Sequence, residues 1–177
     1  MQQAIIDKLS DWLKLECPTH DAAAVNAMHD LILRDVVDAP VAVERIPGRD
    51  GLGDTVLLRA GPEQDRDGIF IITHVDTVHP IGTATGPLPV RQEGDRLYGP
   101  GSYDMKGGIL VALLAMLDAA RAGRIGRPVT FLLSPDEEIG SPTTRALVEE
   151  IGRRSSHALV MEPARPGGAA VTARKGV

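Results

Sequence analysis

The sequence predicts an α/β fold, a three-layer sandwich whose central sheet is mixed and largely parallel. Two apolar runs, residues 68–73 and 129–134, are typical of strands that are buried on both faces of a sheet. Between them, residues 109–117 are apolar on most faces of a predicted helix, which indicates a buried helix. Strands that alternate with helices in this way favour parallel pairing with helical crossovers.

Composition and charge narrow the class of protein. A chain of 177 residues with 43% hydrophobic and 24% charged residues is typical of one globular domain. The net charge of −5 and the absence of a basic stripe argue against a nucleic-acid partner. Cys17 is the single cysteine, so no internal disulfide can form. The chain has no leader-like N-terminus and no run long enough for a membrane span, so we expect a cytoplasmic protein without a membrane partner.

The first third of the chain predicts two helices and a hairpin. Apolar residues at helical spacing predict a helix over residues 2–16, which Pro18 ends. Thr19 or Asp21 can cap a second helix, which the same period extends to about residue 36. Residues 41–46 and 55–59 predict two strands. The glycines between them match neither nucleotide-binding fingerprint, so we expect a hairpin turn.

The rest of the chain predicts further strands and helices around a long loop. The loop covers residues 80–100 and contains a small hairpin near residues 93–98. The remaining predicted elements are a strand over 68–73, a buried helix that begins near 109, a strand over 129–134, a helix over 143–152, a strand over 158–161 and a strand-like segment over 169–173.

Three adjacent acids, Asp136, Glu137 and Glu138, follow the predicted strand at 129–134. Two carboxylates about 4 Å apart repel by about 4 kcal/mol at an effective dielectric near 20, so the chain must solvate, protonate or neutralise them. Taken alone, this segment is best explained as a solvated acidic turn. Two other predicted strands also end in polar groups, however: His74 and Asp76 follow one, and Glu162 follows the other.

These strand ends, together with Asp104 before the buried helix, predict a metal site. Functional groups in open α/β sheets gather at the carboxyl ends of strands. One imidazole and several carboxylates without an evident lysine or arginine partner suit zinc, cobalt or manganese better than magnesium. His74 and Asp76 are two residues apart in extended chain, so Asp76 can orient the imidazole of His74. A structural histidine is the alternative. Glu137 and Glu138 diverge, so one can bind metal while the other acts as a base.

Four segments resemble the dinuclear zinc carboxypeptidase and deacylase family, which includes glutamate carboxypeptidase, aminoacylase, acetylornithine deacetylase and succinyl-diaminopimelate desuccinylase. The segments are His-Val-Asp-Thr-Val at 74–78, Gly-Pro-Gly at 99–101 through Asp-Met-Lys-Gly-Gly at 104–108, Ser-Pro-Asp-Glu-Glu-Ile-Gly-Ser at 134–141, and Met-Glu-Pro at 161–163. The last of these looks most like glutamate carboxypeptidase.

The resemblance implies a role for each candidate residue. Asp104 would bridge two zinc ions, often with a cis peptide bond after it. His74 and Glu162 would complete one metal site, and Glu138 would serve the other. Glu137 would be the general base, and Asp76 would orient His74.

The resemblance also implies that residues 1–177 are only the N-terminal part of a catalytic domain. The family's second metal needs a histidine from a C-terminal part that follows a lid or dimerisation domain. The four other histidines match no such motif; they are His20, His29, His79 and His157. We therefore expect a homodimer at full length and an inactive fragment here.

The resemblance and the residues at the strand ends together predict a hydrolase that uses a metal-activated water. Its predicted substrate is a small peptide or an N-acyl amino acid, in which it would cleave the peptide or N-acyl amide bond. One alternative is a non-catalytic metal-binding or interaction fragment that needs a second chain or a C-terminal half. A two-metal phosphatase or nuclease is a weaker alternative, because lysine and arginine are scarce around the motifs.

Overall fold

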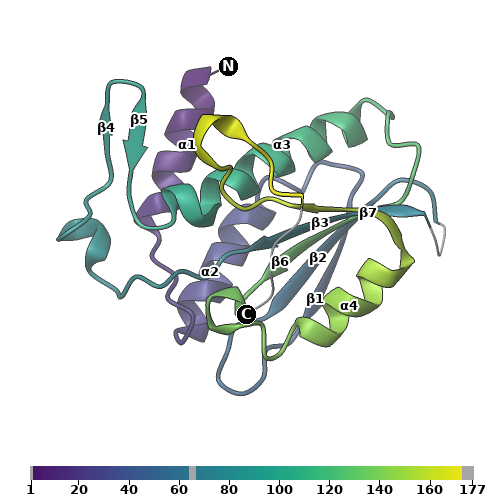
Figure 1. Ribbon diagram of the computed structural model, residues 1–177, viewed down its shortest axis with the longest axis horizontal. Coiled ribbons are helices and arrows are strands. Elements are labelled where there is room, and N and C mark those ends of the chain that lie inside the picture. The colour runs from purple at the N-terminus through teal and green to yellow at the C-terminus, as the bar shows by residue number, and fades with distance from the viewer. Residues whose placement is uncertain (1, 64–66, 173–177) are drawn as a thin grey trace.

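The structure is a computed structural model that describes residues 2–63 and 67–172. It consists of a central sheet with helices on both faces (Figure 1). The main helices are α1 (Gln2–Lys14), α2 (Ala22–Leu33), α3 (Gly107–Arg121) and α4 (Arg145–Arg154). The strands of the sheet are β1 (Ala42–Ile46), β2 (Thr55–Ala60), β3 (Gly68–His74), β6 (Val129–Ser134) and β7 (Ser155–Val160). Within the described residues, no helix combines the length and the apolar character needed to cross a membrane.

The sheet is mixed, as the sequence predicts, with the strand order β1-β2-β6-β3-β7. β1 and β2 form the predicted hairpin, and β2 also pairs with β6 in the antiparallel sense. β3 pairs in parallel with both β6 and β7. These three parallel strands are the ones whose ends carry the predicted acids and histidine.

Two apolar clusters on opposite faces of the sheet confirm the three layers. On one face, side chains such as Leu58 and Phe131 pack against α1, α2 and α3, with Trp12 fully in the core. On the other face, Phe70 and its strand neighbours pack against α4 through residues such as Leu147. Each central strand contributes side chains to both clusters, because successive residues of a strand point to opposite faces of the sheet.

Most predicted elements agree with the structure within a few residues, and one does not. The loop hairpin consists of β4 (Arg91–Glu93) and β5 (Arg96–Tyr98), which pair in the antiparallel sense. The strand-like segment predicted at 169–173 is wrong for its described part, because Ala169 makes only an isolated bridge with Arg165 and residues 170–172 have no regular structure. Its last residue lies outside the described residues.

Candidate metal centre

The three parallel strands deliver their polar groups to one edge of the sheet. His74 ends β3 and lies opposite Ser134, the last residue of β6. Glu137 and Glu138 follow in the short helical turn η3 (Glu137–Ile139), and Glu162 lies two residues beyond β7. Asp104 comes from η2 (Ser102–Lys106), the turn that leads into α3. The structure thus brings together the residues that the strand-end argument predicts, although they are far apart in sequence.

His74 is the buried centre of this group, with a side chain only 1% exposed. Its Nε2 lies 3.1 Å from an oxygen of Asp104, 3.4 Å from an oxygen of Glu162 and 3.9 Å from an oxygen of Glu137. Its Nδ1 is 3.0 Å from the backbone oxygen of Asp76 and 3.3 Å from the carboxylate of the same residue. One ring nitrogen therefore faces the acids, while the other is held by Asp76.

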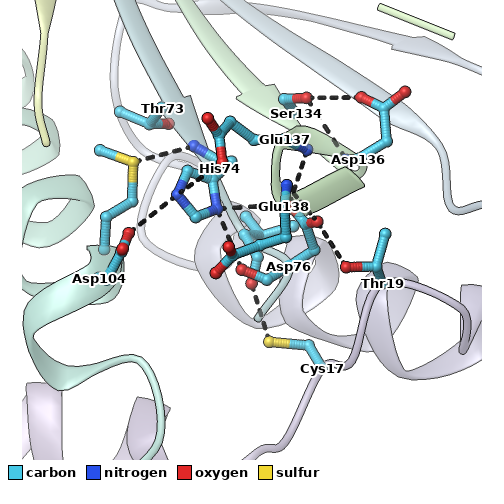
Figure 2. Close-up of polar contacts among 12 residues, drawn as sticks. Cys17, Thr19, Thr73, His74, Asp76, Asp104, Ser134, Asp136, Glu137 and Glu138 are labelled. Atoms are coloured by element: carbon cyan, nitrogen blue, oxygen red, sulfur yellow. Dashed lines mark hydrogen bonds and ion pairs between the residues drawn. The ribbon is translucent and has the colours of Figure 1, made fainter. Parts of the chain in front are cut away.

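Asp76 connects His74 to the turn that carries the two glutamates (Figure 2). Its carboxylate is fully buried and accepts hydrogen bonds from the backbone N–H groups of Glu137 and Glu138, both at 3.2 Å. The hydroxyl of Thr19 donates to the same carboxylate at 2.7 Å. The sequence argument anticipated the contact with His74. The backbone oxygen of Asp76 makes the closer contact with the ring, and the links to the η3 turn were not anticipated.

Two overlapping sets of possible ligand atoms share His74. Single ligand atoms of His74, Asp104 and Glu138 lie within 4.8 Å of one another, and so do those of His74, Glu137 and Glu162. Both glutamates of the turn therefore face the group. The expected division, in which Glu138 binds metal and Glu137 acts as the base, stays a prediction.

Burial, and after it the repulsion between neighbouring acids, shifts the pKa values of this group. Burial and the charge of Glu162 raise the pKa of Asp104. Burial and neighbouring carboxylates also raise the pKa values of Glu137 and Glu138. Burial disfavours a charged imidazole at His74, yet the carboxylates of Asp76 and Glu162 raise its pKa to about 11. The cluster therefore favours a positive charge at the Nε2 side of His74, where a proton or a metal ion can supply it.

Asp136, the first acid of the Asp-Glu-Glu run, takes no part in this cluster. Its buried carboxylate accepts hydrogen bonds from the hydroxyl of Ser134 at 3.0 Å and that of Thr144 at 2.6 Å. The backbone N–H and the hydroxyl of Thr143 also donate to it, at 2.7 and 2.8 Å. Asp136 therefore fixes the loop between η3 and α4 and so presents the two glutamates.

Lys106, whose role the sequence leaves open, is fully buried. Its ammonium donates to the backbone oxygen of Trp12 at 3.2 Å and to that of Leu15 at 2.7 Å. A cation at the C-terminal end of a helix is favoured by the helix dipole, so this contact ties the Asp104 turn to α1. The peptide bond between Asp104 and Met105 is cis, the form that the resemblance implies.

The donor set fits a borderline divalent cation. One neutral imidazole with two or three carboxylates is a common ligand set for zinc and its close substitutes. A metal-binding histidine usually donates its second ring N–H to a carboxylate or a backbone oxygen, and Asp76 offers both to His74. In addition, a bound cation would relieve the repulsion among Asp104, Glu137 and Glu138.

Comparison with known proteins identifies the family. The model of "Peptidase family M20/M25/M40" matches residues 70–174. The chain belongs to this family. The match includes every residue of the candidate metal centre, from His74 to Glu162.

Curated relatives carry two kinds of activity in their names. Carboxypeptidase G2 of Pseudomonas sp. (strain RS-16) is 32% identical over 171 residues, which cover 94% of this chain and 40% of the relative. Acetylornithine deacetylase of Myxococcus xanthus is 34% identical over 110 residues, which cover 62% of this chain and 28% of the relative. The chain therefore spans well under half the length of these relatives.

Solved structures confirm the α/β fold. The aminopeptidase PepT of Bacillus cereus superposes with a TM-score of 0.70 at 15% identity, over 93% of this chain and 44% of the other. Identity this low supports the fold and nothing finer.

Proposed function

We propose that this chain is the N-terminal part of the catalytic domain of a zinc-dependent hydrolase that cleaves a peptide or N-acyl amide bond. The observation that carries the proposal is the group of acids within coordination reach of His74 in a member of this peptidase family. The names of the relatives, a carboxypeptidase and a deacetylase, support small peptides and N-acyl amino acids as substrates.

In this proposal His74, Asp104 and Glu162 hold one zinc ion, and Asp104 and Glu138 contribute to a second. Cobalt or manganese could replace zinc, because both accept the same imidazole and carboxylate ligands. When bound, such an ion would supply Lewis-acid chemistry: it would polarise the carbonyl of the scissile bond and lower the pKa of a water molecule. Within the described residues, both candidate ligand sets depend on the same imidazole, so the second site needs a ligand from elsewhere.

The side chains of the cluster divide the remaining work between them. Asp76 keeps the imidazole of His74 oriented, as its contacts with Nδ1 support. Glu137 takes a proton from the attacking water and delivers it to the leaving amine. Its half-exposed carboxylate can reach substrate, and burial together with neighbouring acids raises its pKa toward the range of an effective base.

The whole protein, in this proposal, is longer than the chain and adds a lid or dimerisation domain and the C-terminal part of the catalytic domain. The lengths of the relatives support that extent. Homodimer formation at full length and a cytoplasmic location stay predictions from the sequence and its resemblance.

Two substitutions test the proposal in different ways. Asp104→Ala should abolish tight zinc binding, because in this proposal the Asp104 carboxylate would be a ligand in both metal sites. Glu137→Ala should keep the zinc and lose about 10²–10⁴-fold in turnover, the usual contribution of a general base. Zinc content after dialysis can be measured on the 177-residue chain. Turnover requires a polypeptide that continues into the segments that its relatives carry.

Asp118→Ala is the matched control, since Asp118 is an exposed acid on α3. Zinc retention by Asp104→Ala at the parent's stoichiometry would contradict the assignment of Asp104 as a metal ligand. Loss of zinc from Glu137→Ala would make Glu137 a ligand instead of the base. Tight zinc binding without turnover in the longer polypeptide would favour the non-catalytic metal-binding alternative.

A further inference from the structure

Thr19 contacts the metal centre indirectly, through the buried carboxylate of Asp76. It lies in the link between α1 and α2, 57 residues before Asp76, and its side chain is almost fully buried. Its hydroxyl donates to Oδ2 of Asp76 at 2.7 Å, the shortest contact that this carboxylate makes among the described residues (Figure 2). The hydroxyl therefore contributes directly to satisfying a buried charge.

The link that carries Thr19 is itself fixed to the end of β3. Pro18 forms a parallel bridge with Thr77, whose N–H donates to the oxygen of Cys17 at 2.9 Å. The thiol of Cys17 donates to the oxygen of Val75 at 2.9 Å. These bonds hold the backbone on both sides of Asp76 against the link. Thr19 is thus a fixed donor and not a side chain that happens to come near.

The two oxygens of Asp76 have separate partners. Oδ1 faces Nδ1 of His74 and accepts from the N–H of Glu137. Oδ2 accepts from the N–H of Glu138 and from Thr19. The last torsion of an aspartate side chain has broad energy wells, so the carboxylate plane is set by its donors. Without the Thr19 hydroxyl, Oδ2 keeps only the N–H of Glu138, so the plane is held less firmly and Oδ1 can move away from Nδ1 of His74. The backbone oxygen of Asp76 then remains as the closer contact of that ring nitrogen.

We propose that Thr19 is a positioning residue of the metal centre, which acts through Asp76 to fix the imidazole of His74 and the turn of Glu137 and Glu138. The part of this inference that concerns metal binding rests on the proposed function, in which the centre holds zinc. Its effect on the η3 turn does not require a metal and can be measured without one.

Thr19→Val tests the proposal, because valine keeps the shape of the side chain and removes the hydroxyl. Thr77→Val is the matched control. Thr77 is just as buried and lies next to Asp76, yet its hydroxyl has no hydrogen-bond partner within the described residues. Thr19→Ser keeps the hydroxyl and serves as the rescue variant.

The first readout is amide hydrogen exchange in the metal-free 177-residue chain. We expect the amides of Glu137 and Glu138 to exchange about tenfold or more faster in Thr19→Val, the factor that one hydrogen bond to a charged group typically contributes. Exchange at these amides should match the parent in Thr77→Val and Thr19→Ser. Parent-like exchange in Thr19→Val would overturn the proposal whether or not the chain binds zinc.

The second readout is zinc affinity, measured by competition with a chelating dye, together with the visible spectrum of Co²⁺ bound in its place. Loss of a group in direct contact with a metal ligand typically costs about 10–100-fold in affinity. Thr19 acts one residue further out, through Asp76, so we expect the lower end of that range, about tenfold, for Thr19→Val, together with an altered Co²⁺ spectrum. Thr77→Val and Thr19→Ser should resemble the parent.

The two readouts separate the inference from the proposed function. A parent chain that binds no zinc contradicts the proposed metal centre, while amide exchange still decides whether Thr19 positions the turn. Tight binding by the parent and equally tight binding by Thr19→Val would overturn the inference alone. Should Thr19→Val fail to fold, Thr19→Ala removes the same hydroxyl without adding a methyl group, and the same outcomes apply to it.

Discussion

Asp136, Glu137 and Glu138 are neighbours in the chain, but their carboxylates meet different surroundings. Asp136 turns into the protein, where hydroxyl and backbone donors satisfy it, and these bonds lower its pKa despite burial. Glu137 and Glu138 turn outward to a group of acids, where burial and repulsion raise their pKa values. Residue type alone does not tell a carboxylate whose hydrogen bonds are satisfied from one that is held among other acids, because the groups around each carboxylate decide its pKa.

His29 shows the same principle for a base. It is fully buried on α2, and neither ring nitrogen has a hydrogen-bond partner among the described residues. Burial and, after it, the positive charge of Arg45 lower the pKa of His29 to about 4, against the opposing effects of Asp54 and Asp30. The neutral imidazole therefore behaves as part of the core.

We predict that His29 makes the fold less stable as pH falls from about 6.5 to 4. In that range the unfolded chain binds a proton at His29 and the folded chain does not, so the free energy of unfolding falls by about 1.4 kcal/mol per pH unit from this group. His29→Met should remove this part of the slope, as urea unfolding at several pH values can measure. The exposed His20→Met is the control, and an unchanged slope in His29→Met would contradict the burial argument.

At the scale of elements, the start of α3 and the chain after β7 approach each other unusually closely. A Cβ atom added to Gly108 would lie 2.1 Å from the backbone oxygen of Met161, a distance that real contacts do not reach. Met161 immediately precedes Glu162, and its N–H is bonded to Ile72 of β3 at 3.1 Å. Glycine at this helix position therefore sets where Glu162 lies relative to Asp104.

We predict that Gly108→Ala lowers both the stability of the fold and the affinity for zinc, because the backbone of Met161 and Glu162 must move. Gly152→Ala is the matched control: Gly152 also lies in a helix, and an added Cβ meets nothing within 4 Å. Alanine there should stabilise the chain by about 0.5–1 kcal/mol, the usual helix preference over glycine. Urea unfolding and dye competition measure the two effects. Parent-like values for Gly108→Ala would show that the contact is not a constraint.

Sequence patterns predict most helices and strands and bring together the acids around His74, and the reason differs from one feature to the next. Uninterrupted apolar runs identify β3 and β6, and the rule that functional groups gather at the carboxyl ends of strands unites His74 with Glu162. The hydrogen bond from Thr19 to Asp76 leaves no pattern, because a single hydroxyl that meets a carboxylate 57 residues away depends on packing alone. The sequence also contains no pattern that predicts the burial of Lys106. A buried lysine usually pairs with a carboxylate, whereas Lys106 donates to backbone carbonyls at the end of α1.

At the scale of the whole molecule, one edge of the described sheet is open and apolar. β7 pairs only with β3 among the described strands, and its Leu159 and Val160 are 48% and 58% exposed. An exposed apolar edge strand favours association with another chain or with more of the same sheet. The relatives, of which this chain spans 40% or less, are long enough to provide such a cover.

The last prediction concerns the 177-residue chain on its own. It should bind at most one zinc ion tightly, because in the proposed assignment His74, Asp104 and Glu162 would provide three ligands at one site, whereas Asp104 and Glu138 alone would remain for a second. Amidase activity should therefore be negligible, and the open edge at β7 should make the chain oligomeric or marginally stable. Zinc titration, light scattering and hydrolysis of an N-acetyl amino acid measure these properties.

Asp104→Ala, exposed to the same zinc concentration, is the control for adventitious binding in these assays, since it lacks the carboxylate that both proposed metal sites share. Robust hydrolysis by the parent chain alone would contradict the prediction, because a second complete site would then exist without any further segment. His79 would be the first residue to substitute in that case, as it lies only a few residues beyond Asp76 on the loop that leaves β3. Loss of activity in His79→Ala with the first zinc retained would then assign the missing ligand to this loop.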